Sequence, residues 1–419
     1  MLRLRVHGVE YDASAWAARH PGGRVLLEML DGCDASQHFD AAHAPGGAAQ
    51  RVLQKLPRTG ACGPNAEHDC VPPFVRAVAE ERARLERAGL FTPQPLAYVP
   101  RAAALAAMLA AALGVRLVVP SAALFALFLQ QCAFVGHDAG HNSVLATPAA
   151  NARLGVLVGN LLTGVSIGWW KSTHNAHHAA TNALEWDPDI QHAPVLVVSP
   201  AFLAPRGVFS AFHRRWLGVL PRERTLVRYQ HWYFYPLMAV ARFNLYWQSA
   251  CYALRPDVPR CEAAALAGYF AGLALWTASW PTLQHGLAWL LLSHALAGIL
   301  HVQIALSHFF QPCYAGPVRA GPAFVAAQLE GTTDLAVPWW CAWFHGGLQW
   351  QAAHHVFPRL PRDHLPRARA ALRDLCARHG VTYHVCGWWA ANAALVRALA
   401  AAGRAGDTRT VCAAWHAVG

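Results

Sequence analysis

The sequence predicts a mainly α-helical, polytopic membrane protein with about four transmembrane helices, a histidine-rich region on the cytosolic side and a small N-terminal α+β domain. Three observations indicate this class. Hydrophobic residues make up 55% of the 419 residues and charged residues only 14%, and several apolar runs reach membrane length. The 24 histidines outnumber the 23 carboxylates, which indicates a site that needs imidazole. This composition excludes a coiled coil, a fibre and a disordered chain.

The net charge and the cysteines exclude further classes. The formal net charge of +11 is attributed to cytosolic loops, because basic residues beside apolar spans are typical of membrane proteins, and no nucleic-acid binding is expected. The 11 cysteines lack regular spacing, so we expect reduced thiols and neither a disulfide framework nor a cysteine zinc site. No signal peptide is expected, and the N-terminus should stay in the cytosol.

Residues 1–60 are predicted to form a small soluble domain. Alternating Leu2, Leu4 and Val6 favour a strand, a His-Gly turn follows, and Tyr11 belongs to a second short extended piece. Amphipathic helices are expected at residues 13–18, 24–30 and 35–41.

Residues 61–100 are predicted to be a linker that tethers this domain. They combine Pro-Gly-rich punctuation with a charged helix at residues 74–88. The membrane domain is expected to occupy residues 101–400, and residues 401–419 to form a C-terminal tail. No internal repeat is visible.

Four membrane spans are predicted. The apolar run Ala102–Val135 is long enough for two short spans of about 17 residues each. Ala263–Trp280 and Leu287–Phe309 are clearer spans, whereas Leu154–Trp170 is expected to lie at the membrane interface. Four crossings return the chain to its starting side, and arginines precede the first span, so this side is expected to be the cytosol.

Three clusters of histidine lie on that predicted face. They contain His137 and His141, then His174, His177 and His178, and finally Gln351, His354 and His355. Spacings of three and four residues place side chains on one face of a helix, which is the geometry of a chelating pair. Imidazole ligands suit iron, zinc, copper or nickel, and seven histidines exceed the ligands of one tetrahedral zinc, so two metals are indicated. Asp138, Asp187 and Asp189 are candidates to accept hydrogen bonds from the ligand imidazoles.

Other histidines are expected to have different roles. His294, His301 and His308 recur every seven residues in the last predicted span, so they share a stripe. His294 and His301 are expected to be buried histidines bonded to neighbours, whereas His308, at the cytosolic end of the span, is a candidate ligand. Histidines without such spacing, including His38, are assigned surface or structural roles.

A second histidine pair lies in the N-terminal domain. His20 begins a His-Pro-Gly-Gly turn, and His43 ends the stretch DASQHFDAAH. Pro21 and the two glycines allow the backbone to approach a flat ligand closely, and a histidine on each side can bind a haem iron axially.

Together these residues resemble the cytochrome b5 fusion front-end membrane desaturases. The N-terminal stretch resembles their cytochrome b5 domain. Residues 163–195, 229–246 and 334–365 resemble the plant-type branch, which contains sphingoid-base Δ8 and acyl-lipid Δ6 desaturases. The resemblance runs from near the first strand to the C-terminus.

The resemblance implies a set of ligands. His20 and His43 would bind haem b. The di-iron ligands, which are also the catalytic residues, would be His137, His141, His174, His177, His178, His354 and His355. Gln351 matches the glutamine that begins the family's third histidine box, and His308 matches an additional ligand of related membrane desaturases. Ser307 replaces the usual asparagine of this branch, and Ala352-Ala353 replaces the usual Ile-Glu.

The implied activity is that of an O2-dependent oxidoreductase which inserts a double bond into a lipid chain. Electrons would come from NADH through a separate NADH–cytochrome b5 reductase. We expect Δ8 desaturation of sphingoid long-chain bases, with Δ6 desaturation of acyl lipids as the alternative. A di-iron lipid hydroxylase and a non-enzymatic membrane haem electron carrier are further alternatives. The expected location is the endoplasmic reticulum membrane, with the haem domain and histidine clusters facing the cytosol.

Overall fold

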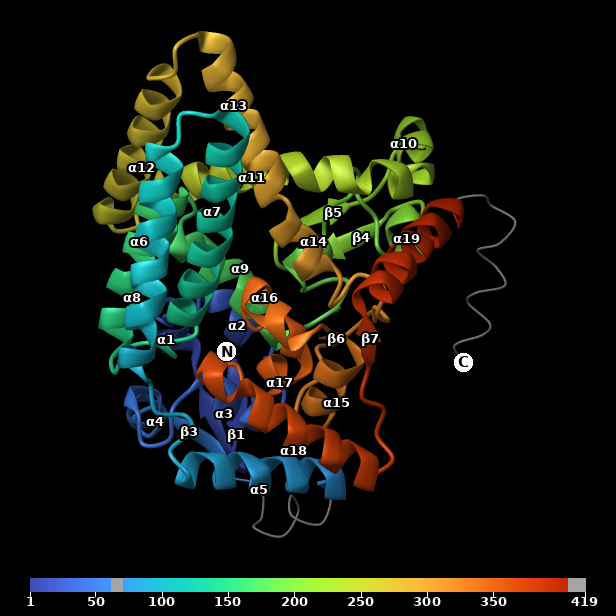
Figure 1. Ribbon diagram of the computed structural model, residues 1–419. Coiled ribbons are helices and arrows are strands. Elements are labelled where there is room, and N and C mark those ends of the chain that lie inside the picture. The colour runs from blue at the N-terminus through green and yellow to red at the C-terminus, as the bar shows by residue number, and fades with distance from the viewer. Residues whose placement is uncertain (62–70, 406–419) are drawn as a thin grey trace.

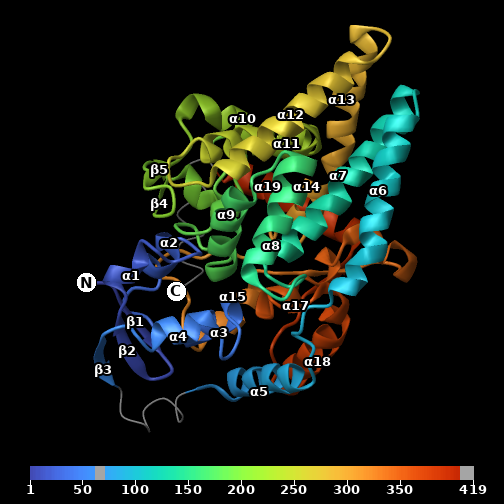
Figure 2. The ribbon, with the colours of Figure 1, turned by 90° about the vertical axis from the view of Figure 1, so that its left-hand side faces the viewer.

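Long helices project from one end of the molecule, and a small unit that contains a sheet lies towards the other end (Figure 1, Figure 2). This computed structural model describes residues 1–61 and 71–405. Part of the predicted linker, residues 62–70, and most of the predicted C-terminal tail, residues 406–419, lie outside the described residues.

The N-terminal unit is a three-stranded antiparallel sheet with four short helices around it. The strands lie in the order β1 (Arg3–Val6), β2 (Val9–Asp12) and β3 (Arg58–Ala61). The helices are α1 (Ser14–Ala17), α2 (Arg24–Glu28), α3 (Ser36–Ala42) and α4 (Ala48–Leu53). The first two strands and first three helices confirm the predicted elements, whereas β3 and α4 have no predicted counterpart. Leu4 and Val6 are buried together, because alternate residues of a strand face the same side.

This unit packs directly against the rest of the protein. Its apolar core continues into alanines of α9 (Ile167–Ala179) and of the loop that follows. Helix α3 joins a second apolar cluster with α15 (Ala323–Glu330). The charged helix expected within the predicted linker forms as α5 (Pro73–Arg87), and it packs on α18 (Leu365–Arg378).

Within the described residues, four helical segments are long and apolar enough to cross a membrane, which confirms the predicted number. These segments are Pro95–Gly114, Val118–Gly140, Arg260–Ala278 and Leu283–Ala305. They contain α6 (Val99–Gly114), α7 (Val118–Gly140), α12 (Arg260–Ala278), and α13 (Leu283–Ala297) followed by α14 (Ile299–Ala305). Helix α7 packs against both α6 and α13, so it lies in the middle of the bundle.

Among the boundaries that differ from the predicted spans, two change the place of a histidine. Helix α7 continues beyond the predicted end of the second span, so His137 lies in its last turn. The fourth span breaks at Gly298, where a Cβ atom would lie 2.5 Å from the carbonyl oxygen of Met238, so only glycine allows this close approach. The fourth span also ends earlier than predicted, and His308 lies in the loop after α14.

The segment expected at the membrane interface, residues 154–170, is not among the candidate spans. It covers the end of α8 (Pro148–Gly155), a π-helical turn (Val156–Leu161) and the start of α9. Two helices without a predicted counterpart follow, α10 (Arg224–Arg228) and α11 (Gln230–Ala253). The many aromatic residues and the internal Pro236 of α11 hide its helical period in the sequence.

The C-terminal third covers the lower end of the helix bundle (Figure 1). Its strands and helices are β6 (Asp334–Ala336), α16 (Ala342–His345), α17 (Gln351–Val356), β7 (Val385–Gly387) and α19 (Trp388–Arg404). Strands β6 and β7 pair in parallel, and β4 (Val208–Ser210) pairs with β5 (Arg215–Leu217) in an antiparallel hairpin. Helix α17 packs between α15 and α18, which holds the third histidine cluster in place.

Candidate metal centre

Four separate elements bring the histidines to one place. The first cluster lies at the end of α7, the second on α9, the third on α17, and His308 in the loop after α14. Helix α9 is fixed at its start, where the Ser166 hydroxyl accepts the backbone N–H of Trp169 and donates to the buried carboxylate of Glu262 (2.6 Å). This cap satisfies N–H groups that have no partner within the helix, so it fixes where α9 begins.

Seven histidines form two groups. Within each group, the nitrogen atoms that could bind a metal all lie within 4.8 Å of one another. The first group contains His137, His141, His174 and His354. The second contains His177, His308 and His355. The structure therefore brings together the predicted clusters and His308, although their sequence positions are far apart.

His178 lies between the two groups. Its Nε2 atom is 3.0 Å from Nε2 of His174 and 3.1 Å from Nε2 of His354, both in the first group. Its ring stacks on that of His355 in the second group, with ring centres 4.2 Å apart. Nitrogen lone pairs from several helices thus converge at His178.

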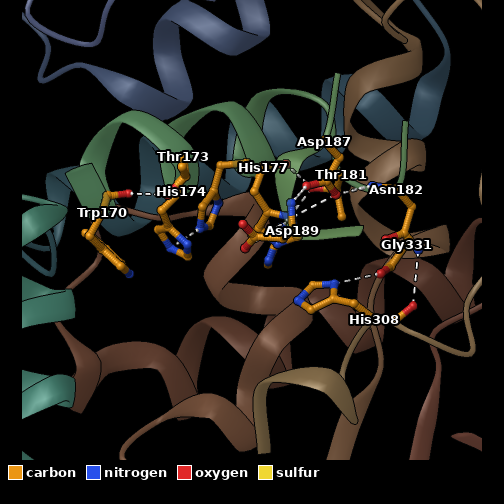
Figure 3. A network of polar contacts seen from close by, with 12 residues as sticks. Trp170, Thr173, His174, His177, Thr181, Asn182, Asp187, Asp189, His308 and Gly331 are labelled. Carbon is orange, nitrogen blue, oxygen red and sulfur yellow. Dashed lines mark hydrogen bonds and ion pairs between the residues drawn. The ribbon is translucent and has the colours of Figure 1, made fainter. Parts of the chain in front are cut away.

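Each imidazole of the second group is oriented by an acceptor at its Nδ1 atom, as Figure 3 shows for His177 and His308. Nδ1 of His177 donates to Asp187 Oδ2 (2.9 Å), Nδ1 of His308 to the Gly331 carbonyl (3.0 Å), and Nδ1 of His355 to Gln328 Oε1 (2.9 Å). Protonation at Nδ1 leaves the Nε2 lone pair free, and this pattern is typical of metal-binding histidine.

The predicted acceptors differ in their contacts. Asp187 has the predicted role, and Asp189 is more distant, with its Oδ2 atom 3.9 Å from Nδ1 of His177. Asp138 makes only a long contact of 3.4 Å with Nδ1 of His137. Its other oxygen is held by Arg362 and by the Tyr98 hydroxyl (2.7 Å), so Asp138 mainly fixes the end of α7.

Burial and charge keep most of these imidazoles neutral. Burial lowers the pKa well below its usual value for His141, His174, His178, His308, His354 and His355. Burial also disfavours the charged form of His177, but the carboxylates of Asp187 and Asp189 outweigh it and raise the pKa to about 9. Neutral imidazole is the form that binds metal. Nε2 of His137 and Nε2 of His355 are buried and have no hydrogen-bond partner among the described residues. The donor set therefore fits a transition-metal centre.

Gln351 and the two alanines after it have distinct surroundings. Gln351 Nε2 lies 3.1 Å from Nε2 of His308, and its Oε1 atom is buried without a hydrogen-bond partner. Ala352 and Ala353 pack in an apolar cluster. A carboxylate lies close to these alanines, because Asp334 accepts the backbone N–H of Ala352 (3.0 Å).

Trp170, Gly140 and Gln328 belong to the site but have no predicted role. Trp170 stacks on His174 with ring centres 4.2 Å apart, and a Cβ atom on Gly140 would lie 2.1 Å from this indole. Gln328 accepts from His355 and donates to the carbonyl of His178. No spacing rule identifies these residues, because their roles arise only from helix packing.

The second histidine pair lies in the N-terminal unit. The ring centres of His20 and His43 are 6.3 Å apart, and their Nδ1 atoms donate to the carbonyls of Gly23 (3.2 Å) and Phe39 (2.9 Å). Both Nε2 lone pairs are thus available, and burial lowers the pKa of His20 and lowers that of His43 to about 4. An iron bonded to two Nε2 atoms at about 2 Å separates ring centres by about 6 Å, so the pair fits axial haem ligation.

The structure has a buried histidine centre at one end of four candidate spans and a haem-binding histidine pair in a separate unit. These features define a membrane-bound oxidoreductase that has its own electron carrier. Residues 114–387 match the family model for fatty acid desaturase, and residues 4–63 match that for the cytochrome b5-like haem/steroid-binding domain. The chain therefore belongs to the fatty acid desaturase family and carries a cytochrome b5-like domain, which confirms the resemblance. It is a membrane desaturase that acts on a lipid and has a haem domain and a metal centre.

Several relatives that are named as desaturases are similar over two thirds or more of the chain. The Delta(8)-fatty-acid desaturase 2 of Arabidopsis thaliana is 37% identical over 95% of this chain and 89% of its own length. The acyl-lipid (9-3)-desaturase of Borago officinalis is 32% identical over 95% of this chain and 89% of its own length. The Delta 8-(E)-sphingolipid desaturase of Komagataella phaffii is 36% identical over 67% of this chain and 53% of its own length.

One substitution tests how the second group is oriented. We expect Asp187→Asn to lower metal content and turnover by about 10–100-fold, because His177 loses the charged acceptor that orients it. Asp189→Asn is the matched control, since its longer contact predicts a smaller loss. Metal analysis and product formation measure both effects. Equal losses in the two variants would contradict the assigned role of Asp187.

Proposed function

We propose that this enzyme introduces a Δ8 double bond into sphingoid long-chain bases, using O2 and electrons delivered through its haem domain. The observation that carries the proposal is the pair of buried histidine groups that share His178. The names of the Arabidopsis and Komagataella relatives support the Δ8 position. Δ6 desaturation of acyl lipids is the second candidate, because a relative similar over nearly the whole chain is an acyl-lipid desaturase.

The proposed ligands follow from the two groups. His137, His141, His174 and His354 would hold one iron ion, and His177, His308 and His355 a second. His178 would complete the set between them, and Gln351 would lie beside the second ion. Bound iron supplies the oxidising power that removes hydrogen from an unactivated C–H bond, which no side-chain acid or base can do.

The protein's own residues prepare this chemistry. Asp187, Gln328 and Gly331 accept the Nδ1 protons of three imidazoles, which leaves Nε2 as the atom that binds metal. His177, whose pKa is about 9, would release its Nε2 proton when metal binds. Burial of these side chains excludes water, which would otherwise quench a strong oxidant. A small cleft beside the first group is lined by the apolar side chains of Phe134 and Leu348 and by the charged pair of Asp138 and Arg362.

The cytochrome b5-like domain supports the proposed partner, and charge supports the proposed location. NADH–cytochrome b5 reductase would reduce the haem between His20 and His43. The exposed basic residues Arg76, Arg84 and Arg87 lie on α5, before the first span, which favours a cytosolic position for the haem unit and the histidines in the endoplasmic reticulum membrane.

Lipid analysis in yeast tests the proposed function. The protein and its His355→Ala variant are expressed separately, and sphingoid bases and fatty acyl chains are analysed by mass spectrometry with double-bond localisation. We expect a new Δ8 double bond in sphingoid bases with the unmodified protein and none with the variant. A Δ6 bond confined to acyl chains would overturn the sphingoid assignment, and a hydroxylated product would change the reaction to that of a hydroxylase.

A further inference from the structure

One histidine of the haem unit contacts an element that carries the metal centre. His38 lies on α3, and its Nε2 atom donates a hydrogen bond to the carbonyl oxygen of Ala179 (3.0 Å), the last residue of α9. The side chain is only 7% exposed, and its ring lies against Phe324 of α15 with ring centres 4.2 Å apart. Carbonyls at a helix end have no partner within the helix, so His38 satisfies one across the boundary between two folded units.

Both ends of this contact adjoin candidate ligands. On the haem side, His38 is followed in α3 by Phe39, whose carbonyl accepts the Nδ1 proton of His43 (2.9 Å). On the metal side, Ala179 directly follows His178, which contacts both histidine groups. Two hydrogen bonds and the backbone between them therefore connect a haem-binding histidine to the centre of the metal site without a gap.

The surrounding contacts hold the two units together at this point. Apolar residues of the N-terminal unit pack on α9, and α3 packs on α15 (Figure 2). Arg82 of α5 donates to the carbonyl of His43 (3.5 Å), so a third element also fixes the haem side. Gln328 donates to the carbonyl of His178, directly before the carbonyl that His38 binds. The end of α9 is thus held by side chains from both units.

We propose that His38 is a positioning residue for electron transfer, linking the haem to the metal centre through Phe39, Ala179 and His178. This inference rests on the proposed function. Electronic coupling decays less steeply along covalent and hydrogen bonds than across empty space, because orbitals overlap along them. Each transfer moves one electron, so the haem iron is oxidised from ferrous to ferric and one ion of the metal centre is reduced. No bond forms or breaks.

Three variants separate the link from simple docking. His38→Leu keeps an apolar side chain of similar size at the interface but removes the donor to Ala179. His38→Gln keeps an N–H group at about the reach of Nε2, so it is the conservative rescue. Phe324→Leu keeps the hydrogen bond and weakens only the ring contact, so it reports the effect of looser packing alone.

The experiment measures electron transfer in the full-length holoenzyme without O2 or lipid. A light pulse on a photosensitising flavin injects one electron into the haem, and haem absorbance then follows its reoxidation by the ferric metal centre. We expect a first-order phase that does not depend on protein concentration in the unmodified protein. We expect His38→Leu to slow this phase by about tenfold, with the haem spectrum and midpoint potential unchanged, and His38→Gln and Phe324→Leu to retain most of the rate.

Two results would contradict the proposed role of His38, and only the second would also contradict the proposed function. An unchanged rate in His38→Leu, accompanied by a lower thermal stability, would make His38 a docking residue only and would leave the proposed function intact. Absence of haem reoxidation in the unmodified protein with both metals bound would instead contradict electron delivery to the metal centre, and with it the proposed function.

Discussion

Replacement of His355 by alanine is expected to lower desaturation by more than about 100-fold, because loss of a ligand should exceed the 10–100-fold cost of losing an outer partner. His355 is fully buried, is oriented by Gln328, and stacks on His178 at the boundary between the two groups. Its loss would affect both proposed iron positions. Product formation and non-haem iron content measure the effect.

The haem provides an internal control for this variant. His355→Ala should retain the haem spectrum of the unmodified protein, because His20 and His43 lie in a separate unit. His285→Ala is the matched control, since His285 is exposed and bonds only within its own helix start, with Thr282. Desaturation retained by His355→Ala would contradict the assignment of the second histidine group as a metal site.

Replacement of His43 by alanine is expected to have the opposite effect to His355→Ala, namely loss of haem with retention of non-haem iron. It removes one axial ligand of the haem, so the haem spectrum should disappear and electron delivery should stop. Desaturation that depends on the protein's own haem should fall by more than about 100-fold, whereas non-haem iron should remain bound because the two metal groups keep all their ligands.

A matched variant isolates the role of the ligand. Phe39→Leu keeps the backbone carbonyl that accepts the Nδ1 proton of His43 and changes only the neighbouring ring. It should therefore retain haem. A His43→Ala protein that bound haem with an unchanged spectrum would show that His43 is not an axial ligand.

Much of the fold follows from local pattern. Alternation at Leu4 and Val6 predicts β1, and the apolar runs predict four spans, because these signals depend on neighbouring residues alone. The end of the fourth span is different. Its break at Gly298 depends on the carbonyl of Met238 in α11, a contact between distant segments that no local pattern contains.

The histidine spacing predicts which pairs share a helix face but not how the pairs combine. His177 and His178 are neighbours in sequence, yet His177 belongs to the second group while His178 lies between the groups. This division depends on where α7, α9 and α17 meet. His38 shows the same limit. A single histidine without a spaced partner predicts only a surface or structural role, and the structure gives His38 a buried position at the boundary between the two units.

Mössbauer spectroscopy of the purified protein, with its non-haem and haem iron quantified, tests the central claim most directly. The two histidine groups predict two non-haem iron ions for each haem, with a spectrum that shows the ions to be magnetically coupled. The His355→Ala variant should lose this signal and keep its haem signal. A protein with full haem and full desaturation activity but zinc, or a single isolated iron, at the histidine groups would contradict the account.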